Sequence, residues 1–457
     1  MNRALLPLVG LGSLLLALML AALMLHVPGA DSVGSPSRTN VFVGLLGAGM
    51  VVYLAAVRLA VRDALPRQSL WIVLGVAVIL RVALLPAPPF LSSDIYRYVW
   101  DGRVQAAGIN PYSYVPADPA LAWVRDPAIF PHINRAGYAR TIYPPAAQLF
   151  FALVGRISAG VTGMKLAMVG CEALAMGCLL RLLADAGLPP QRLLIYAWNP
   201  LVLWSFAGDG HVDAVAIALL AVALLCRTRR RDGPAGMILA AAALVKFLPV
   251  VAAPAFLRGG RLWQPALAGA VTMALLYALY FSAGSHVLGF LPAYGGEEGL
   301  ADGSGFWLLA GLSRLAPLPA QATHLYELGI VAGFVLLSLW IARRAASADA
   351  GVGLCRDTAM LAALATVAIS PHYPWYFAWL ALPSVVAPLP AVIWLSVAPI
   401  ALYLDPFHER FFWPSLIYLP AAGLCLATIR RRRGRHGVVA STIIVTSTEV
   451  VTSEGVS

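Results

Sequence analysis

Charged side chains are scarce in this chain. They make up only 12% of its 457 residues, whereas 60% of the residues are hydrophobic. A soluble globular protein carries about 25% charged residues, so the composition excludes that class and indicates a polytopic membrane protein. The net charge of +11 suggests a nucleic-acid partner at first sight. The arginines instead cluster at the ends of apolar segments, as in membrane proteins, so we expect membrane lipids and no nucleic acid as partners.

Cysteine and lysine are also scarce. The five cysteines lie within or beside apolar segments, and none has the spacing of a metal-ligand pair. A disulfide framework and a zinc site are therefore not expected. Only two lysines occur, Lys165 and Lys246, and the second lies deep inside an apolar segment.

Long apolar runs account for most of the chain. A helix crosses the hydrocarbon core in about 20 residues, and runs of that kind predict an all-α polytopic membrane protein with about 12–14 transmembrane helices. The expected spans are 5–25, 40–57, 69–86, 163–183, 192–208, 212–226, 262–284, 324–342, 389–404 and 411–429, with shorter ones at 357–371 and 374–388. Residues 1–435 are expected to form one domain in the cell membrane. Residues 436–457 lack an apolar period and predict a flexible cytoplasmic tail.

Two segments do not fit a simple alternation of spans. Three apolar segments separate the 87–143 loop from Asp209, but only an even number places both on one side. We therefore expect 144–160 to be interfacial or re-entrant, unless a boundary is misplaced. Segment 235–257 has basic residues at both ends and prolines inside, which predicts two half-helices that return to the cytoplasmic side.

With these corrections, four polar segments lie on one extracytoplasmic face. They are the 87–143 loop, Asp209-Gly-His-Val-Asp213, the 285–302 loop, and Ser370-Pro-His-Tyr-Pro-Trp-Tyr376. Hydrocarbon does not solvate such residues, so they indicate a site in water or in a protein-lined cleft. The two halves of the chain show no internal repeat, which argues against a transporter.

The long loop opens with Ser92-Ser-Asp-Ile-Tyr-Arg-Tyr-Val-Trp-Asp101. In a helix, Asp94, Arg97 and Asp101 share one stripe. Asp94 is then either a general base toward a sugar hydroxyl or simply a helix cap, with Arg97 paired to Asp101.

Other side chains also have two readings. Tyr112, Tyr143 and their aromatic neighbours suit either sugar stacking or a membrane-interface belt. Lys246 is either the contact of a phosphate or a snorkelling lysine. The motif with Asp209, His211 and Asp213 has two readings. Its side chains bind substrate hydroxyls or a divalent cation, or they simply form a polar helix end. His372, in an aromatic cluster, is more often structural.

The order of these motifs resembles that of polyprenol-phosphate-dependent mannosyltransferases of the C-type glycosyltransferase superfamily (GT-C), especially bacterial glycosyltransferase family 87 and the mycobacterial α-1,6-mannosyltransferase type. The resemblance covers roughly residues 70 to 430. The motifs that carry it are Asp94-Ile-Tyr-Arg-Tyr-Val-Trp-Asp-Gly-Arg103, Gly108-Ile-Asn-Pro-Tyr112, Thr141-Ile-Tyr-Pro-Pro145, Gly210-His-Val-Asp213 and Val245-Lys-Phe-Leu-Pro249. The acidic motif here is Ser-Asp in place of an Asp-Asp or Glu-Asp pair.

The resemblance implies a membrane glycosyltransferase that moves a hexose, with mannose expected, from a polyprenyl-phosphate sugar to a lipid or glycan acceptor with inversion. It implies Asp94 as the catalytic base and Asp101 as its helper, at the extracytoplasmic face. The expected substrate contacts are Tyr96, Arg97, Arg103, Asn110, Tyr112, Tyr143, Gln148, His211, Asp213, Lys246 and His372. It implies no particular cofactor, and a divalent cation stays open. The alternative is a non-catalytic lipid or glycan flippase or transporter.

Overall fold

The structure, a computed structural model, describes residues 5–25, 36–62, 65–257, 263–344, 350–404 and 410–451. Side chains are described except at 36, 37 and 432–451. Every regular element in these ranges is a helix. This confirms the all-α class that the apolar composition predicts.

Nineteen α-helices are joined by short 3₁₀ turns, a π-helical turn at Trp204–Gly208 and irregular loops within those ranges. They are α1 (Leu6–Met24), α2 (Pro36–Arg62), α3 (Ser69–Leu84), α4 (Asp94–Ala106), α5 (Pro145–Ile157), α6 (Val161–Asp185), α7 (Leu194–Ala197), α8 (Pro200–Leu203), α9 (Asp213–Thr228), α10 (Asp232–Ala243), α11 (Ala253–Phe256), α12 (Trp263–Ala278), α13 (Leu291–Glu297), α14 (Trp307–Ser313), α15 (Ala322–Arg343), α16 (Ala350–Ile369), α17 (Ala381–Val386), α18 (Pro390–Leu395) and α19 (Phe412–Val451).

Six of these helices are long and apolar enough to cross a membrane, and up to eight spans result if each of two bent helix pairs is one span. The protein is thus a multi-pass membrane protein with fewer long spans in the described ranges than the sequence predicts. The difference arises because several apolar segments form short or broken helices, such as α3, α5 and α18. The predicted tail at 436–457 stays a prediction, because its side chains and residues 452–457 lie outside the described part.

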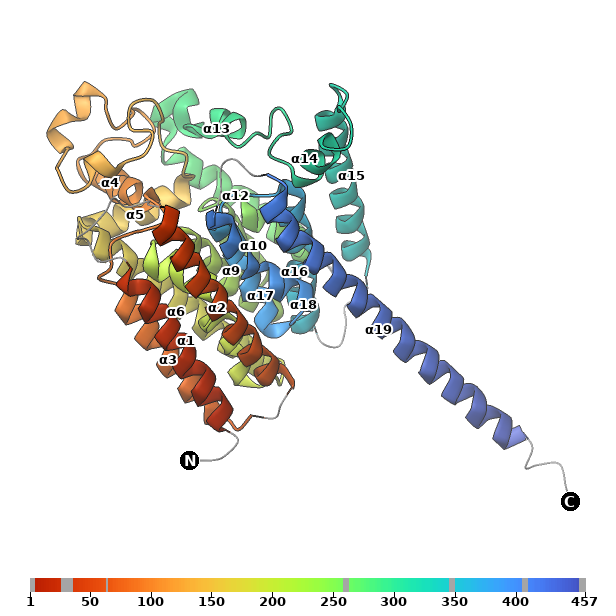
Figure 1. The fold of residues 1–457 in the computed structure, drawn as a ribbon. Coiled ribbons are helices and arrows are strands. Elements are labelled where there is room, and N and C mark those ends of the chain that lie inside the picture. Colours follow the sequence, from red (N-terminus) through yellow and green to blue (C-terminus); the bar gives the residue numbers. More distant parts are fainter. Residues whose placement is uncertain are drawn as a thin grey trace, which may run out of the picture.

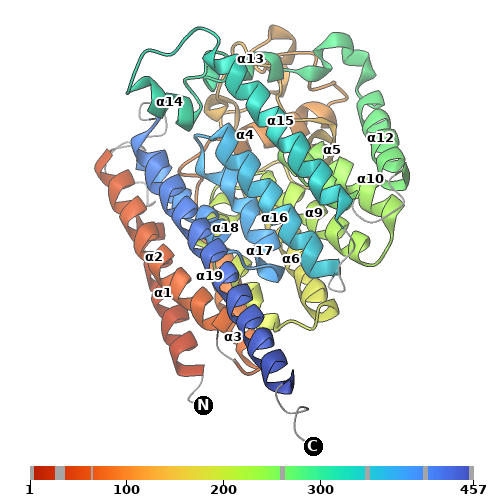
Figure 2. The same ribbon diagram turned by 90° about the vertical axis from the view of Figure 1, so that its right-hand side faces the viewer.

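The helices form an elongated bundle with its loops gathered at one end (Figure 1). The segment between α3 and α5, together with α13 and α14, covers that end, and both chain termini lie at the other. The view turned by 90° shows α2 and α19 on one side of the bundle and α10 and α12 on the other (Figure 2). We call the two ends the loop end and the terminal end.

The interior of the bundle is apolar but contains a buried ion pair. Trp198 and Trp204 are among its largest fully buried side chains. Arg81 of α3 contacts Glu172 of α6 at 2.6 Å, and both side chains are almost completely buried. Because an unpaired charge is very costly in such surroundings, this pair fixes α3 against α6.

Segment 235–257 returns to the side from which it starts, as the sequence predicts. The α10 helix rises beside α9, breaks at Leu244, and the chain descends again through α11. At the tip, Lys246 contacts Asp213, the first residue of α9. At the base, the Arg227 guanidinium donates to the Phe256 carbonyl at 2.8 Å, at the last turn of α9. The re-entrant hairpin therefore extends along the whole of α9.

Segment 144–160 also does not cross the bundle. Its helix α5 has only 13 residues and packs along α4 of the loop end. Arg103, in the last turn of α4, donates to the carbonyl of Ala159 just beyond α5. This agrees with the expected interfacial or re-entrant segment.

Two glycines allow α4 and α5 to touch through their backbones. A Cβ placed on Gly102 would lie 2.4 Å from the Phe151 carbonyl oxygen, and one on Gly155 would lie 2.9 Å from Gly102. Since backbone atoms cannot move aside as flexible side chains do, this contact requires glycine at both positions.

We predict that Gly102→Ala separates α4 from α5 and lowers the melting temperature of the detergent-solubilised protein. The matched control is Gly170→Ala in α6, where an added Cβ meets nothing within 4 Å. That control is expected to melt no lower than the wild type, because its added Cβ meets no atom and alanine favours the helix. Equal melting temperatures for all three proteins would show that the backbone contact is not required.

Candidate active site

A cavity of about 340 Å³ opens at the loop end, and three of the four predicted polar segments line it. Its volume lies in the range of small-molecule sites. Its lining comes from α4, the long loop, the tip of the re-entrant hairpin, α13 and the segment after α16. The polar and aromatic lining residues include Asp94, Arg97, Asn134, Arg135, Arg140, Tyr143, Lys246, Tyr294, Tyr373, Trp375 and Tyr376.

Asp94 is the cavity's carboxylate, and no other Asp or Glu among the described residues lines it. It is the first residue of α4, and its Oδ1 accepts a hydrogen bond from the Asn134 side chain at 3.2 Å. Burial raises the pKa of this carboxyl above its ordinary value, while the nearby Lys246 ammonium and the Asn134 amide partly oppose that rise. About a quarter of its side chain remains exposed, so its oxygens are accessible from the cavity.

The Asp209-Gly-His-Val-Asp213 motif lies in the break between two helical segments that are bent by 117°. Asp209 accepts hydrogen bonds from the backbone amides of Phe90 and Leu91, just ahead of Asp94. The His211 Nδ1 lies 3.9 Å from Asp94 Oδ2, and its ring stacks on Trp375. The motif therefore lies behind the start of α4.

Gly210 makes this arrangement possible. Its φ of +71° is strained for other residues, and a Cβ there would lie 2.3 Å from the Ile95 side chain. The turn thus brings His211 directly behind the start of α4.

Lys246 lies at the tip of the re-entrant hairpin and reaches the cavity. Its Nζ is 2.8 Å from Asp213 Oδ2 and 3.9 Å from the centre of the Tyr376 ring. The Lys246 ammonium thus lies at the loop end of the bundle, beside Asp213.

The Thr141-Ile-Tyr-Pro-Pro145 motif joins the hairpin tip to α5. The backbone amides of Ala146 and Ala147, in the first turn of α5, both donate to the Leu244 carbonyl. Pro145 occupies the first helical position, where its missing amide hydrogen is not needed. Tyr143 and Lys246 are thereby held on neighbouring walls of the cavity.

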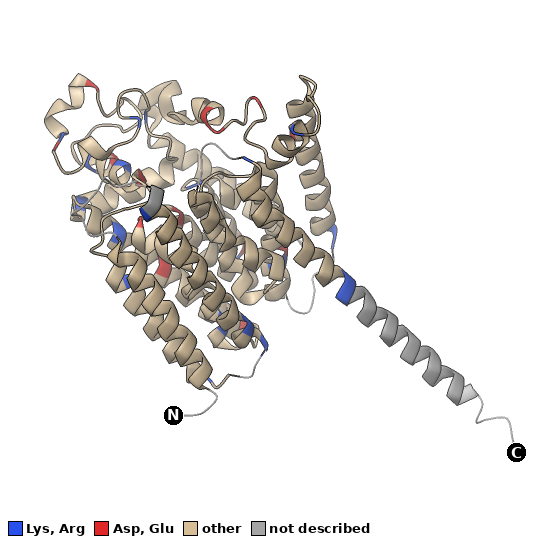
Figure 3. Cartoon of the chain, viewed as in Figure 1, with Lys and Arg blue, Asp and Glu red and all other residues tan. Residues whose placement is uncertain are grey.

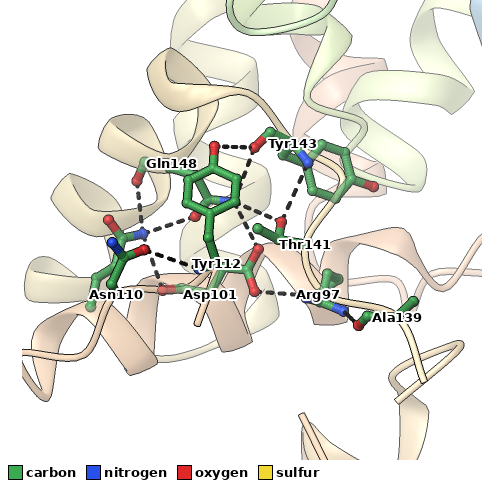
Figure 4. Close-up of polar contacts among 9 residues, drawn as sticks. Arg97, Asp101, Asn110, Tyr112, Ala139, Thr141, Tyr143 and Gln148 are labelled. Carbon is green, nitrogen blue, oxygen red and sulfur yellow. Dashed lines mark hydrogen bonds and ion pairs between the residues drawn. The ribbon is translucent and has the colours of Figure 1, made fainter. Parts of the chain in front are cut away.

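Asp101 lies in a buried network beside the cavity and does not line it (Figure 4). Its carboxylate accepts from Arg97 at 2.8 Å and from Gln148 at 2.9 Å. Tyr112, also buried, donates to the Tyr143 carbonyl. The pairing of Arg97 with Asp101, which the sequence left open, is therefore present, and the helper role of Asp101 stays a prediction.

The remaining predicted contacts lie outside the cavity lining. Tyr96 stacks on His132, Arg103 pairs with Asp126, Asn110 donates to Ser282, and His372 contacts Glu298. These four side chains hold the loops of this end together. Asp209, His211 and Asp213 face separate partners, and the described residues contain no group of three His, Cys, Asp or Glu side chains arranged as metal ligands.

The sequence did not single out several residues that line the cavity. Asn134, Arg135 and Arg140 belong to the long loop, and Tyr294 and Tyr376 come from two other polar segments. Their loops were predicted to converge, but no motif marks which side chains point inward.

Comparison with known proteins identifies the family. The sequence model of the family described as alpha-(1->6)-mannopyranosyltransferase, N-terminal domain, matches residues 6–258, more than half of the chain. The chain belongs to this mannosyltransferase family. It is also 24% identical over 408 residues to alpha-(1->6)-mannopyranosyltransferase A of Mycobacterium tuberculosis, a match that covers 80% of this chain and 77% of that protein. No solved structure matches. The matched region contains Asp94, the Asp209–Asp213 motif and Lys246.

The ion pair between Lys246 and Asp213 yields a stability prediction. Lys246→Met or Asp213→Asn leaves the partner's charge in a largely buried position, which costs roughly 3 kcal/mol or more of unfolding free energy. The double variant is expected to lose less than the sum of the two. Denaturant unfolding of the solubilised protein measures these differences.

The exposed pair Arg229–Asp185 serves as the control, since its ions are already solvated. Arg229→Gln is expected to leave the unfolding midpoint near the wild-type value. Strict additivity of the Lys246 and Asp213 changes would contradict a coupled pair.

Proposed function

We propose that the protein transfers mannose from a polyprenyl-phosphate-linked donor to a hydroxyl of a lipid or glycan acceptor with inversion, forming an α-(1→6) bond. The observation that carries the proposal is the position of Asp94. It is the carboxylate of the cavity, and the Lys246 ammonium lines the same cavity. Family membership supports mannose as the sugar and the (1→6) linkage.

Asp94 acts as the general base. It takes the proton of the acceptor hydroxyl while that oxygen attacks the anomeric carbon, and the bond from that carbon to the phosphate oxygen breaks. The bonding electrons leave with the polyprenyl phosphate. A retaining reaction through a covalent intermediate would use a second carboxylate about 5 Å away. Within the described residues the cavity has one, which favours single displacement.

Lys246 is the proposed hydrogen-bond donor to the leaving phosphate. One of its three N–H groups points to Asp213, so others remain for a ligand. Asp213 holds Lys246 in place, and the His211 ring lies beside Asp94 behind the cavity.

We place the cavity at the extracytoplasmic face. The last turns of α2, α9 and α15 carry Arg62, Arg227 and Arg343. These helices run from the loop end toward the terminal end (Figure 1), and Figure 3 shows basic residues at helix ends there. Arginines beside spans favour the cytoplasmic side, which supports the opposite side for the cavity.

The first test replaces the base. Asp94→Asn keeps the shape of the side chain but cannot accept the acceptor proton, so mannose transfer in membranes is expected to fall roughly 10²–10⁴-fold. Radiolabelled polyprenyl-phosphate mannose with product identification measures it. The control is Asp118→Asn, whose carboxylate accepts a loop amide outside the cavity and whose activity should stay near wild type.

Asp101→Asn distinguishes the two acidic residues of the motif. Loss of the Arg97 contact should lower the melting temperature, while the correctly folded fraction keeps most of its transfer rate. A fully active Asp94→Asn variant would overturn the proposed base, whatever Asp101→Asn does.

The pH dependence gives a second test. Asp94 must be ionised to accept a proton, so kcat/KM falls as the pH drops through its pKa. The Lys246 charge lowers that pKa, and Lys246→Met therefore should move the acidic limb to higher pH. Profiles of kcat/KM against pH for both proteins measure the shift. If the acidic limb of the kcat/KM profile stays at the same pH in Lys246→Met, the Lys246 charge does not lower the pKa of Asp94.

A further inference from the structure

Four cations line the cavity within the described residues, and three of them contact a carboxylate. Arg97 lies 2.8 Å from Asp101, Arg135 lies 2.7 Å from Glu297, and Lys246 lies 2.8 Å from Asp213. Each of these positive charges is balanced by a negative charge of the protein itself. The fourth cation is Arg140.

Arg140 has no carboxylate partner in the described part of the chain. Its Nε donates to the Ser113 carbonyl at 3.3 Å, which fixes the side chain from the loop side. No described residue accepts from its terminal nitrogens Nη1 and Nη2. Arg140 is half-buried, lines the cavity and has two nitrogens without an acceptor among the described residues, so it is suited to a bidentate anion.

The balance of charge in the cavity makes this cation necessary. Asp94 contributes a negative charge, and a lipid-phosphate sugar brings another in its phosphodiester. Two negative charges in one partly desolvated cavity repel each other strongly. Arg140 is the positive charge there that the protein does not already neutralise.

The rest of the lining matches the lipid part of such a ligand. Val245, Phe247, Leu248 and Ile369 form an apolar portion of the wall, and Phe247 is 40% exposed. The cavity therefore combines an available cation with apolar surface at the end of a bilayer-embedded bundle. An amphiphilic anion with a single phosphate fits both.

We infer that Arg140 binds the phosphate of the polyprenyl-phosphate sugar and of the polyprenyl phosphate that leaves. This rests on the proposed function, because the phosphate is that of the donor. Lys246 then contributes a hydrogen bond, whereas Arg140 supplies the net charge.

Equilibrium binding of two probes to the purified full-length protein tests the inference without any transfer reaction. The probes are polyprenyl monophosphate and the uncharged polyprenol of equal length. We expect the wild type to prefer the phosphate, and Arg140→Gln to weaken binding of the phosphate by about tenfold or more while polyprenol binding stays unchanged. Arg140→Lys should restore part of the preference, because it keeps the charge and loses the bidentate fork.

Arg125→Gln is the matched control from the same loop. Its guanidinium donates to the carbonyls of Pro116 and Asp118 and does not line the cavity. The control should keep the wild-type preference. Melting temperatures identify any variant that fails to fold. If Arg140→Gln fails to fold, the binding preference of Arg140→Lys tests the inference instead.

Two other results would overturn the inference in different ways. If Arg140→Gln keeps the full preference for phosphate while Lys246→Met loses it, the phosphate is bound by Lys246 and the proposed function stands. If the wild type binds both lipids equally, the lipid-phosphate donor itself is wrong, and Arg140 has no role in binding it.

Discussion

The ion pair between Lys246 and Asp213 is the contact on which the loop end depends. A lysine at the tip of an apolar hairpin is tolerated only with an anion beside it, and the first residue of α9 provides one. Because the tip is held there, the Leu244 carbonyl meets the first turn of α5, and Val245 to Leu248 become a wall of the cavity. One charge pair thus positions two motifs that lie about a hundred residues apart in the chain.

The Asp209–Asp213 motif connects the remaining parts in a similar way. Each of its polar side chains faces a different segment. Asp209 accepts from the backbone before α4, the His211 ring stacks on Trp375, and Asp213 pairs with the hairpin tip. Lys165 reinforces this from α6 by donating to the carbonyls of Leu84 and Ala87 at the end of α3. The backbone ahead of Asp94 is therefore fixed by Lys165 and by Asp209, a rigid setting of the kind that the proposed proton transfer requires.

The sequence was sufficient for the class of fold and for the convergence of the polar segments. The scarcity of charged residues predicts a membrane protein. Basic residues at both ends of 235–257 predict a segment that returns to the side where it starts. The sequence did not reveal how many apolar runs break into short helices. Tertiary contacts, such as the hydrogen bond from the Ala146 amide to the Leu244 carbonyl, determine where those helices end. Nor did it show that Asp101 pairs with Arg97 away from the cavity. Arg135 and Glu297 are 162 residues apart, and no local pattern marks such a contact.

The re-entrant hairpin also has a consequence for how the protein is made. The α10 helix has 12 residues, too few to cross a bilayer, and the lysine that follows opposes its partition into lipid. The hairpin therefore cannot insert into the membrane as an independent unit. It needs α9 already in the bilayer with Asp213 at the far side, and the order of synthesis provides this because α9 leaves the ribosome first. The hairpin wall of the cavity is thus placed only after α9, and the walls from α13 and the segment after α16 follow later in the chain.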